Sequence, residues 1–234
     1  MLQFILNHWF LLLMQLIAGI LSFIWFYVFN KDKLNMKWWE CFITSILLIV
    51  FGAISSLFFY SFENGFDINK GYGIRIFGFI FFAPLFILVF SKIKKITISN
   101  AFDVLIVAII FSNIGGKINC LHAGCCIGIR FNDSGPRWPA REIELLIHAL
   151  FLVFVIPWIK KGNSNGMAYP LYMVIYGIGR FANEWLTLSN ATSAIHISHV
   201  WAAISVLLGI IWIIIPRLLS KRWKGVMKNE TTHS

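Results

Sequence analysis

A polar segment, residues 117–141, interrupts a chain that is otherwise largely apolar. It reads KINCLHAGCCIGIRFNDSGPRWPAR and combines thiols, an imidazole and several cations. Guanidinium groups offer paired donors that match phosphate oxygens, and imidazole can act as a general base. Polar groups between two apolar runs are costly at membrane depth, so the segment indicates a functional site. The candidate residues here are Lys117, His122, Arg137 and Arg141.

A second polar pattern recurs every four residues through Tyr172, Tyr176, Arg180 and Glu184. Residues at this spacing share one face of a helix, so the pattern predicts a polar stripe. We expect Arg180 and Glu184 to meet the segment 117–141 and to form a site for an anion such as a lipid phosphate. The alternative is an Arg180–Glu184 pair that only holds helices together.

The rest of the chain predicts the elements that would carry these residues. Of its 234 residues, 59% are hydrophobic and only 13% are charged, too few charges to cover a soluble domain of this size. About 20 apolar residues cross the hydrocarbon core of a bilayer. The predicted fold is therefore all-α, a polytopic membrane protein with about seven transmembrane helices. The candidate spans are 9–29, 41–60, 73–91, 97–115, 142–159, 168–186 and 198–216.

The charge distribution predicts the orientation of these spans. The net charge is +10, and most of the lysine and arginine residues follow the first, third, fifth and seventh runs, whereas the loops 61–72 and 187–197 are nearly free of them. Short basic loops stay cytoplasmic, so we expect the N-terminus outside and the C-terminus inside. Residues 1–220 then form one transmembrane domain with 117–141 as an outer re-entrant or surface cap, and 221–234 form a frayed cytoplasmic tail. This pattern does not indicate nucleic-acid binding.

The cysteines and histidines predict no metal site and no cofactor. The chain has four cysteines, too few and too clustered for a disulfide framework. The spacing C-x-H-x-x-C-C from Cys120 to Cys126 matches no standard zinc motif. His148, inside the fifth apolar run, is expected to make a polar contact between helices.

Several runs of sequence resemble a known family. YGIGRFANEW (Tyr176–Trp185) is similar to the Y-G-x-x-R-F-x-x-E signature of bacterial prolipoprotein diacylglyceryl transferases. WPAREIELL resembles the family's H-P-x-Q-L-Y-E segment, with Arg141 at the Gln position and Glu144 at the Glu. HISHVWAAISVLLGI resembles the start of the last helix, with His199 near a family Gln. The likeness covers roughly residues 97–215, and the motifs occur in the family's order.

This resemblance implies an activity in the bacterial cytoplasmic membrane. The family transfers a diacylglyceryl group from phosphatidylglycerol to the cysteine thiol of a lipoprotein precursor. Arg180 would then hold the phosphate, Glu184 would orient Arg180 or accept a proton, and Tyr176 would bind the headgroup or the leaving oxygen. His122 and Lys117 would line the opposite wall. The expected substrate-binding residues are Lys117, Arg137, Arg141, Glu144 and His199.

The chain also departs from the family pattern. Lys117 replaces a central arginine, Cys120 and Ala123 stand at asparagine positions, and Cys125 stands at a glutamate position. The third apolar run has no histidine. Three other functions therefore remain open: transfer of lipid to a different acceptor, such as another secreted cysteine-containing peptide; binding of lipid or peptide without catalysis; and transport.

Overall fold

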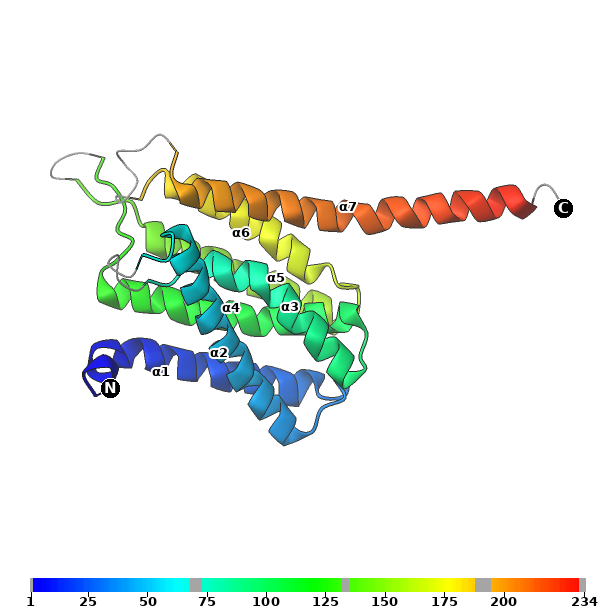
Figure 1. The fold of residues 1–234 in the computed structure, drawn as a ribbon, viewed down its shortest axis with the longest axis horizontal. Coiled ribbons are helices and arrows are strands. Elements are labelled where there is room, and N and C mark those ends of the chain that lie inside the picture. Colours follow the sequence, from blue (N-terminus) through cyan, green and yellow to red (C-terminus); the bar gives the residue numbers. More distant parts are fainter. Residues whose placement is uncertain (1, 68–72, 132–134, 188–194, 232–234) are drawn as a thin grey trace.

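The computed structural model describes residues 2–67, 73–131, 135–187 and 195–231, and their side chains between 9 and 215. Helices make up most of this part of the chain (Figure 1). The helices are α1 (Leu2–Ile24), the π-helical turn η1 (Trp25–Asn30), α2 (Trp38–Glu63), α3 (Ile76–Lys94), α4 (Ile98–Ala123), α5 (Ala140–Lys160), α6 (Ala168–Glu184) and α7 (Ile197–Thr231).

The helices confirm the predicted class, a polytopic membrane protein. Six of those described are long and apolar enough to cross a bilayer. The other, α6, has 17 residues, so it extends over about 26 Å, slightly less than a typical hydrocarbon core. It carries the predicted polar stripe, whose side chains are buried, and these polar residues lower its hydropathy.

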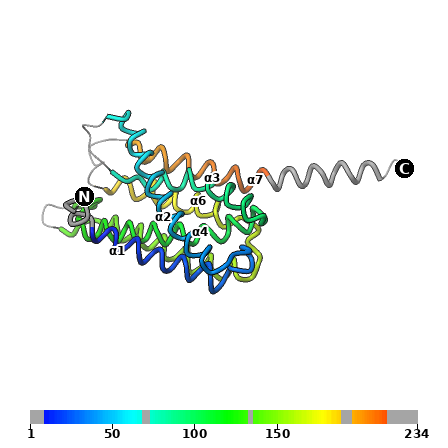
Figure 2. Tube along the Cα trace, turned by 60° about the horizontal axis from the view of Figure 1, so that its bottom comes forward, coloured from blue at the N-terminus to red at the C-terminus, as the bar shows by residue number. Residues whose placement is uncertain are grey.

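Helix α4 is the central helix of the bundle, and it packs against α1, α2, α3, α5 and α6. Every residue from Ala101 to Ile110 is buried. A helix that is apolar on all sides is expected in such a central position. α1 lies alongside α4 in both views (Figures 1 and 2), and α5 and α6 cover other sides of it.

One end of the bundle collects the segments that carry the predicted site. The start of α1, the end of α4, the start of α5, the end of α6 and the start of α7 all lie at the left of Figure 1. α7 runs from this end to the opposite one and extends beyond the other helices. The two termini therefore lie at opposite ends, as an odd number of crossings requires.

The predicted cap, residues 117–141, is shorter than expected because its first turns belong to α4. Gly115 and Gly116 lie within α4. A glycine in a helix costs only about 1 kcal/mol relative to alanine, which packing of the helix can offset. α4 ends instead at Gly124, which takes the left-handed conformation with φ +69°. Between α4 and α5 the structure describes residues 124–131 and 135–139, which form no helix.

The predicted tail also differs from expectation. α7 continues without a break through residue 220 as far as Thr231, so residues 221–231 are helical rather than frayed. Its sequence there, KRWKGVMKNET, contains only one glycine and no proline, and such a sequence permits a helix to continue into a polar region.

The start of α6 is fixed by an aspartate from another helix. Asp103 of α4 is buried, and its carboxylate accepts hydrogen bonds from the Ser164 hydroxyl (2.6 Å) and from the backbone N–H groups of Gly166 (2.7 Å) and Ala168 (3.2 Å). The first N–H groups of a helix lack partners within the helix, and a carboxylate satisfies them well. Asp103 therefore anchors the start of α6 against α4 and fixes the position of its polar stripe along the bundle.

Candidate active site

A cluster of four buried charged side chains joins α4, α5 and α6. Glu144 of α5 forms ion pairs with Lys117 Nζ of α4 through one carboxylate oxygen and with Arg180 Nη1 of α6 through the other. Arg180 Nη2 in turn pairs with Glu184 one helical turn later. None of the four side chains is more than 10% exposed. We call Lys117, Glu144, Arg180 and Glu184 the charge cluster.

A line of hydrogen bonds and ring contacts extends the charge cluster into the bundle. The Tyr176 hydroxyl donates to Glu144 at 3.3 Å, and its ring stacks on His148 at 5.0 Å. His148 Nδ1 lies 3.3 Å from the Tyr172 hydroxyl, which also accepts from Asn113 Nδ2 at 2.9 Å. The interhelical contact predicted for His148 is confirmed. This network ties the charge cluster to three helices.

The charge cluster holds its cations in fixed positions. Breaking a buried ion pair leaves a charge without compensation, which is strongly destabilising, so these partners restrain each other. Two carboxylates balance two cations, and Arg180 Nε finds no hydrogen-bond partner in the described part of the chain. Cations fixed in a site of low polarity stabilise negative charge that develops beside them. The arrangement suits chemistry in which a phosphate leaves.

The α4–α5 connection is bound to the end of α6. Ile129 N–H donates to the Leu186 carbonyl at 2.9 Å. The Trp138 indole donates to Asn183 Oδ1 at 2.8 Å, and Asn183 Nδ2 donates to the Ala140 carbonyl at 2.7 Å. The connection thus lies beside the charge cluster, as the predicted convergence of the two polar patterns requires.

His122 lies apart from the charge cluster. Its exposed ring stacks on Phe10 of α1 with ring centroids 4.0 Å apart and also contacts Trp9. It was expected to line the wall opposite Arg180. The helical continuation of α4 through residue 123 turns it toward α1 instead, because residues two positions after Cys120 face a different side of the helix.

The two other predicted arginines lie at the edge of the site. Arg137 is exposed, and its backbone forms an isolated bridge with Arg130. Arg141 is half-buried, with Nη1 3.5 Å from the Cys120 carbonyl and Nη2 3.8 Å from Glu142. Arg141 therefore reaches the end of α4, whereas the Arg137 side chain is exposed.

His199 stabilises the start of α7. It is buried, its Nδ1 accepts from the His196 N–H at 3.1 Å, and its ring contacts Trp185 and Phe181. His196 is the histidine nearer the charge cluster, with Nδ1 3.8 Å from Glu184 Oε1. This contact of His196 could not be predicted from the sequence, because the spacing alone does not tell which of two histidines three positions apart faces α6.

An apolar groove of about 490 Å³ runs between α3, α6 and α7. A series of aromatic ring contacts leads from the groove to the charge cluster. The ring centroid of Trp201, in the groove, lies 6.0 Å from that of Phe81. The Phe77 ring centroid lies 5.8 Å from that of Phe81 and 5.9 Å from that of Tyr176. The Trp201 indole N–H is buried and has no partner among the described residues. The groove is lined by Ile80, Phe81, Pro84, Met173, Trp201, Ile204, Leu208, Ile211, Trp212 and Ile215.

Comparison with known families shows the family of the chain. The model of the prolipoprotein diacylglyceryl transferase family matches residues 3–215, most of the chain. The chain belongs to the prolipoprotein diacylglyceryl transferase family. The polar stripe of α6 and the glutamate of α5 are the elements that carried the resemblance, and the charge cluster unites them.

Individual members of the family are distant relatives. Proteins named phosphatidylglycerol–prolipoprotein diacylglyceryl transferase include one from Clostridium tetani, 28% identical over 133 residues, 50% of this chain and 53% of the relative. A second, from Clostridium perfringens, is 24% identical over 181 residues, 68% of each chain. A third, from Dehalococcoides mccartyi strain CBDB1, is 25% identical over 148 residues. The match to the first relative spans about half of its length.

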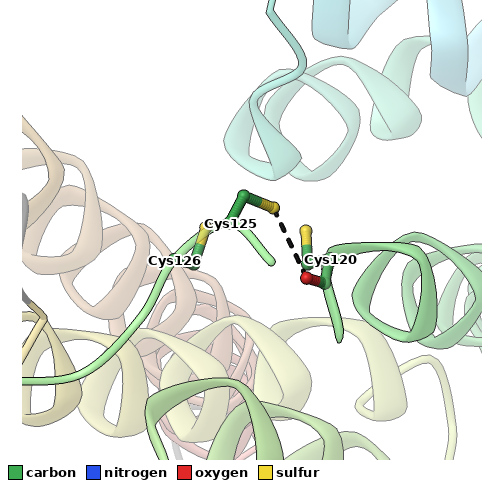
Figure 3. A group of neighbouring side chains, drawn as sticks. All are labelled: Cys120, Cys125 and Cys126. Atoms are coloured by element: carbon green, nitrogen blue, oxygen red, sulfur yellow. Dashed lines mark hydrogen bonds between the residues drawn. The ribbon is translucent and has the colours of Figure 1, made fainter. Parts of the chain in front are cut away.

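This prolipoprotein diacylglyceryl transferase family member also gathers three thiols next to the charge cluster. The Sγ atoms of Cys120, Cys125 and Cys126 all lie within 4.8 Å of one another (Figure 3). Hydrogen bonds from the Cys120 and Cys125 thiols lower the pKa of Cys126 against the opposing effect of burial, and the charges of Lys117 and Arg180 act in the same direction. The sequence did not indicate this group, because the turn at the end of α4 was not predicted.

Proposed function

We propose that this protein transfers a diacylglyceryl group from phosphatidylglycerol to the cysteine thiol of a lipoprotein precursor in the bacterial cytoplasmic membrane. The observation that carries the proposal is the charge cluster at one end of the bundle, in a member of this family. The names of the relatives support both substrates.

The reaction places its greatest electrostatic demand on the phosphate. A carbon–sulfur bond forms at the glycerol carbon, the carbon–oxygen bond to phosphate breaks, and the thiol proton is released. The phosphate thereby gains one negative charge as glycerol phosphate leaves. Fixed cations lower the barrier of such a step, because they interact more strongly with the leaving phosphate than with the lipid.

Each residue of the charge cluster has a proposed role in this reaction. Lys117 and Arg180 supply the positive charge, and Arg180 also has an unused N–H donor at Nε. Glu144 and Glu184 position the two cations, and Tyr176 adds a hydroxyl next to Glu144. Arg141, at the edge, is placed to contact the headgroup as it enters.

The apolar groove between α3, α6 and α7 is the proposed place of an acyl chain. Its wall is apolar and its aromatic side chains lead toward Tyr176. The buried Trp201 indole N–H lacks a partner, and burial of an unpaired donor is unfavourable. A carbonyl oxygen of a lipid ester can accept this hydrogen bond, which would seat the glycerol backbone near the charge cluster.

A transfer assay in vesicles tests the proposal. The purified protein is placed in phosphatidylglycerol vesicles with labelled diacylglyceryl groups and a peptide bearing the lipoprotein cysteine. We expect label on the peptide with the native chain, at least a hundredfold less with Arg180→Ala, and partial activity with Arg180→Lys. Arg75→Ala, which removes an arginine paired with Glu63 outside the charge cluster, should keep native activity.

The assay also separates catalysis from binding. Label that stays on the lipid while the peptide binds the native protein would contradict the transferase and favour a non-catalytic lipid- or peptide-binding role. Native activity in Arg180→Ala would remove the assignment of the charge cluster. Insertion of each variant is checked by its recovery in the membrane fraction and its elution as a single species in detergent.

A further inference from the structure

The three thiols at the end of α4 have the separation of a metal site. Zinc binds thiolate sulfur at about 2.3 Å, which places the sulfurs of a tetrahedral site about 3.8 Å apart. The Sγ atoms of Cys120, Cys125 and Cys126 lie within 4.8 Å of one another. Side-chain rotations that move the sulfur atoms by about an ångström would bring them to this separation, with no change in the position of the helix.

The backbone turn that joins the thiols is unfavourable in itself. Gly124 is left-handed, as is common after a helix, but Cys126 is left-handed as well, with φ +54°. This conformation costs a non-glycine residue about 1 to 2 kcal/mol. It brings the chain back so that the Cys125 and Cys126 thiols lie near that of Cys120, and the Cys125 thiol is directed at the Cys120 carbonyl (Figure 3). Strain of this kind, observed together with converging side chains, indicates a functional thiol group.

The surroundings suit an open metal site rather than a closed one. Cys125 is exposed, and Cys120 and Cys126 are half-buried. A structural zinc site has four protein ligands, whereas a catalytic site has three and leaves the fourth position to substrate. No other described histidine, cysteine or carboxylate joins the three thiols. His122, nearest in sequence, stacks on Phe10 instead.

The positive charges of the charge cluster lie near the three thiols. Lys117 is one helical turn before Cys120 on the same helix, and both Lys117 and Arg180 act electrostatically on Cys126. Three thiolates and one zinc ion carry a net charge of −1. Nearby cations stabilise such a site, and they would also stabilise the phosphate that leaves beside it.

We propose that Cys120, Cys125 and Cys126 bind a zinc ion whose fourth position takes the thiol of the acceptor peptide. This inference rests on the proposed function and supplies what the charge cluster lacks, a way to deprotonate the thiol. A coordinated thiol loses its proton to water and becomes a thiolate. Its sulfur then forms the bond to the glycerol carbon while the carbon–oxygen bond to phosphate breaks. No electrons are gained or lost, and the neutral thioether is a weak ligand that leaves the metal.

Metal binding alone is the first test, because it needs neither lipid nor peptide. The reduced full-length protein in detergent is equilibrated with zinc under anaerobic conditions, passed through a desalting column, and its metal content is measured. We expect about one zinc per chain. Cys120→Ser and Cys126→Ser should each bind less than a tenth of this amount. Cys41→Ser, which alters the buried cysteine of α2, should bind as the native chain does.

Cobalt in place of zinc tests the fourth position. The intensity of the thiolate-to-cobalt charge-transfer absorption follows the number of bound thiolates, so addition of the cysteine peptide should raise it by about a third, from three to four ligands. The same peptide with serine at that position should leave the spectrum unchanged. Neither the zinc content nor the cobalt spectrum depends on turnover, so loss of transferase activity and loss of metal binding are measured separately.

Three outcomes would overturn the proposal. The first is a native chain that binds no zinc, and the second is a Cys120→Ser variant that keeps full zinc binding. The third is a cobalt-loaded protein whose spectrum does not change when the cysteine peptide is added, which would refute the thiol-binding position. Melting temperature in detergent separates a folding defect from loss of ligands, and protection of the thiols from maleimide by zinc provides a second readout.

Discussion

Glu144 is the residue on which the charge cluster depends most. Its two carboxylate oxygens pair with cations from two different helices, Lys117 of α4 and Arg180 of α6, and Tyr176 also donates to it. It is almost completely buried. A single carboxylate at the centre of two ion pairs controls both the position of the cations and the packing of three helices.

Glu144→Gln should therefore impair folding stability and transfer together. The amide keeps the shape of the side chain but leaves Lys117 uncompensated and Arg180 with only Glu184, and loss of one partner of a buried pair costs about 3 to 5 kcal/mol. Glu142→Gln on the same helix, where the side chain is half exposed, should change stability little. Thermal unfolding in detergent and the transfer assay measure both effects; equal behaviour of the two variants would contradict the central role of Glu144.

Trp201 allows a residue-level test of the lipid groove. Removal of its unpaired N–H by Trp201→Phe should weaken transfer from ester-linked phosphatidylglycerol about fivefold, the effect of one hydrogen bond of about 1 kcal/mol. With an ether-linked analogue, which lacks the carbonyl, the native chain should show the same weakening and the variant no further loss. A variant that is weaker on both lipids would instead indicate a packing defect.

At the scale of elements, α6 is placed by contacts at both ends. Asp103 of α4 holds its first turn, and Asn183 at its other end binds the α4–α5 connection. Along its length α6 packs closely on α7. A Cβ atom on Gly177 would lie 2.7 Å from Val206 Cγ2 and 2.9 Å from the Ala202 carbonyl oxygen. The polar stripe can face α4 and α5 only because this opposite side is so close to α7.

Gly177→Ala should separate α6 from α7. The added methyl group meets backbone on α7, which cannot yield as a flexible side chain does, so we expect a loss of about 1 to 3 kcal/mol in stability. Gly116→Ala is the matched control, because a Cβ atom there meets nothing within 4 Å. It should leave stability unchanged or raise it slightly. Thermal unfolding of the two variants in detergent decides, and a Gly177→Ala variant as stable as the native chain would refute the close contact.

The sequence predicted these elements well where the information is local. The polar stripe follows from a spacing of four residues, and the ends of α5 (Ala140–Lys160) agree with the predicted span 142–159 to within two residues. Contacts between helices could not be predicted from local sequence patterns in this way. Glu144 was reached through family resemblance rather than physics, and the cap by Asp103 joins residues more than 60 positions apart.

The connection after α4 shows why the remaining site residues were misplaced. The predicted span ended at residue 115 and the predicted cap began at 117, whereas α4 continues to Ala123. Each added helical residue rotates the following side chain by about 100°, which is why His122 faces α1 and Cys120 meets the returning chain. A small error in a helix boundary therefore changes the composition of the site.

At the scale of the whole molecule, the bundle has distinct ends. The site lies at the end where α1 begins, and α7 extends from the opposite end with a basic sequence, KRWKGVMKNET, beyond residue 220. The charge pattern of the loops predicts that the site faces outward and that the basic end faces the cytoplasm. A lipoprotein precursor meets the outer leaflet after export, so this orientation agrees with the proposed function.

Reporter fusions test the orientation directly. A green fluorescent protein joined after Ser234 should fluoresce, and alkaline phosphatase at the same position should be inactive, because the first folds in the cytoplasm and the second outside. Alkaline phosphatase joined within 61–72, between α2 and α3, should be active. The reversed pattern would place the charge cluster on the cytoplasmic side and contradict the proposed acceptor.

The internal balance of the charge cluster has a consequence for substrate choice. Because Glu144 and Glu184 balance the charges of Lys117 and Arg180, the charge cluster has little net charge with which to attract a distant phosphodiester. Under the proposed function, much of the binding free energy must then come from the hydrocarbon tails of the substrate, which the apolar groove can bury. A soluble glycerophosphate without such tails should therefore compete only weakly in the transfer assay.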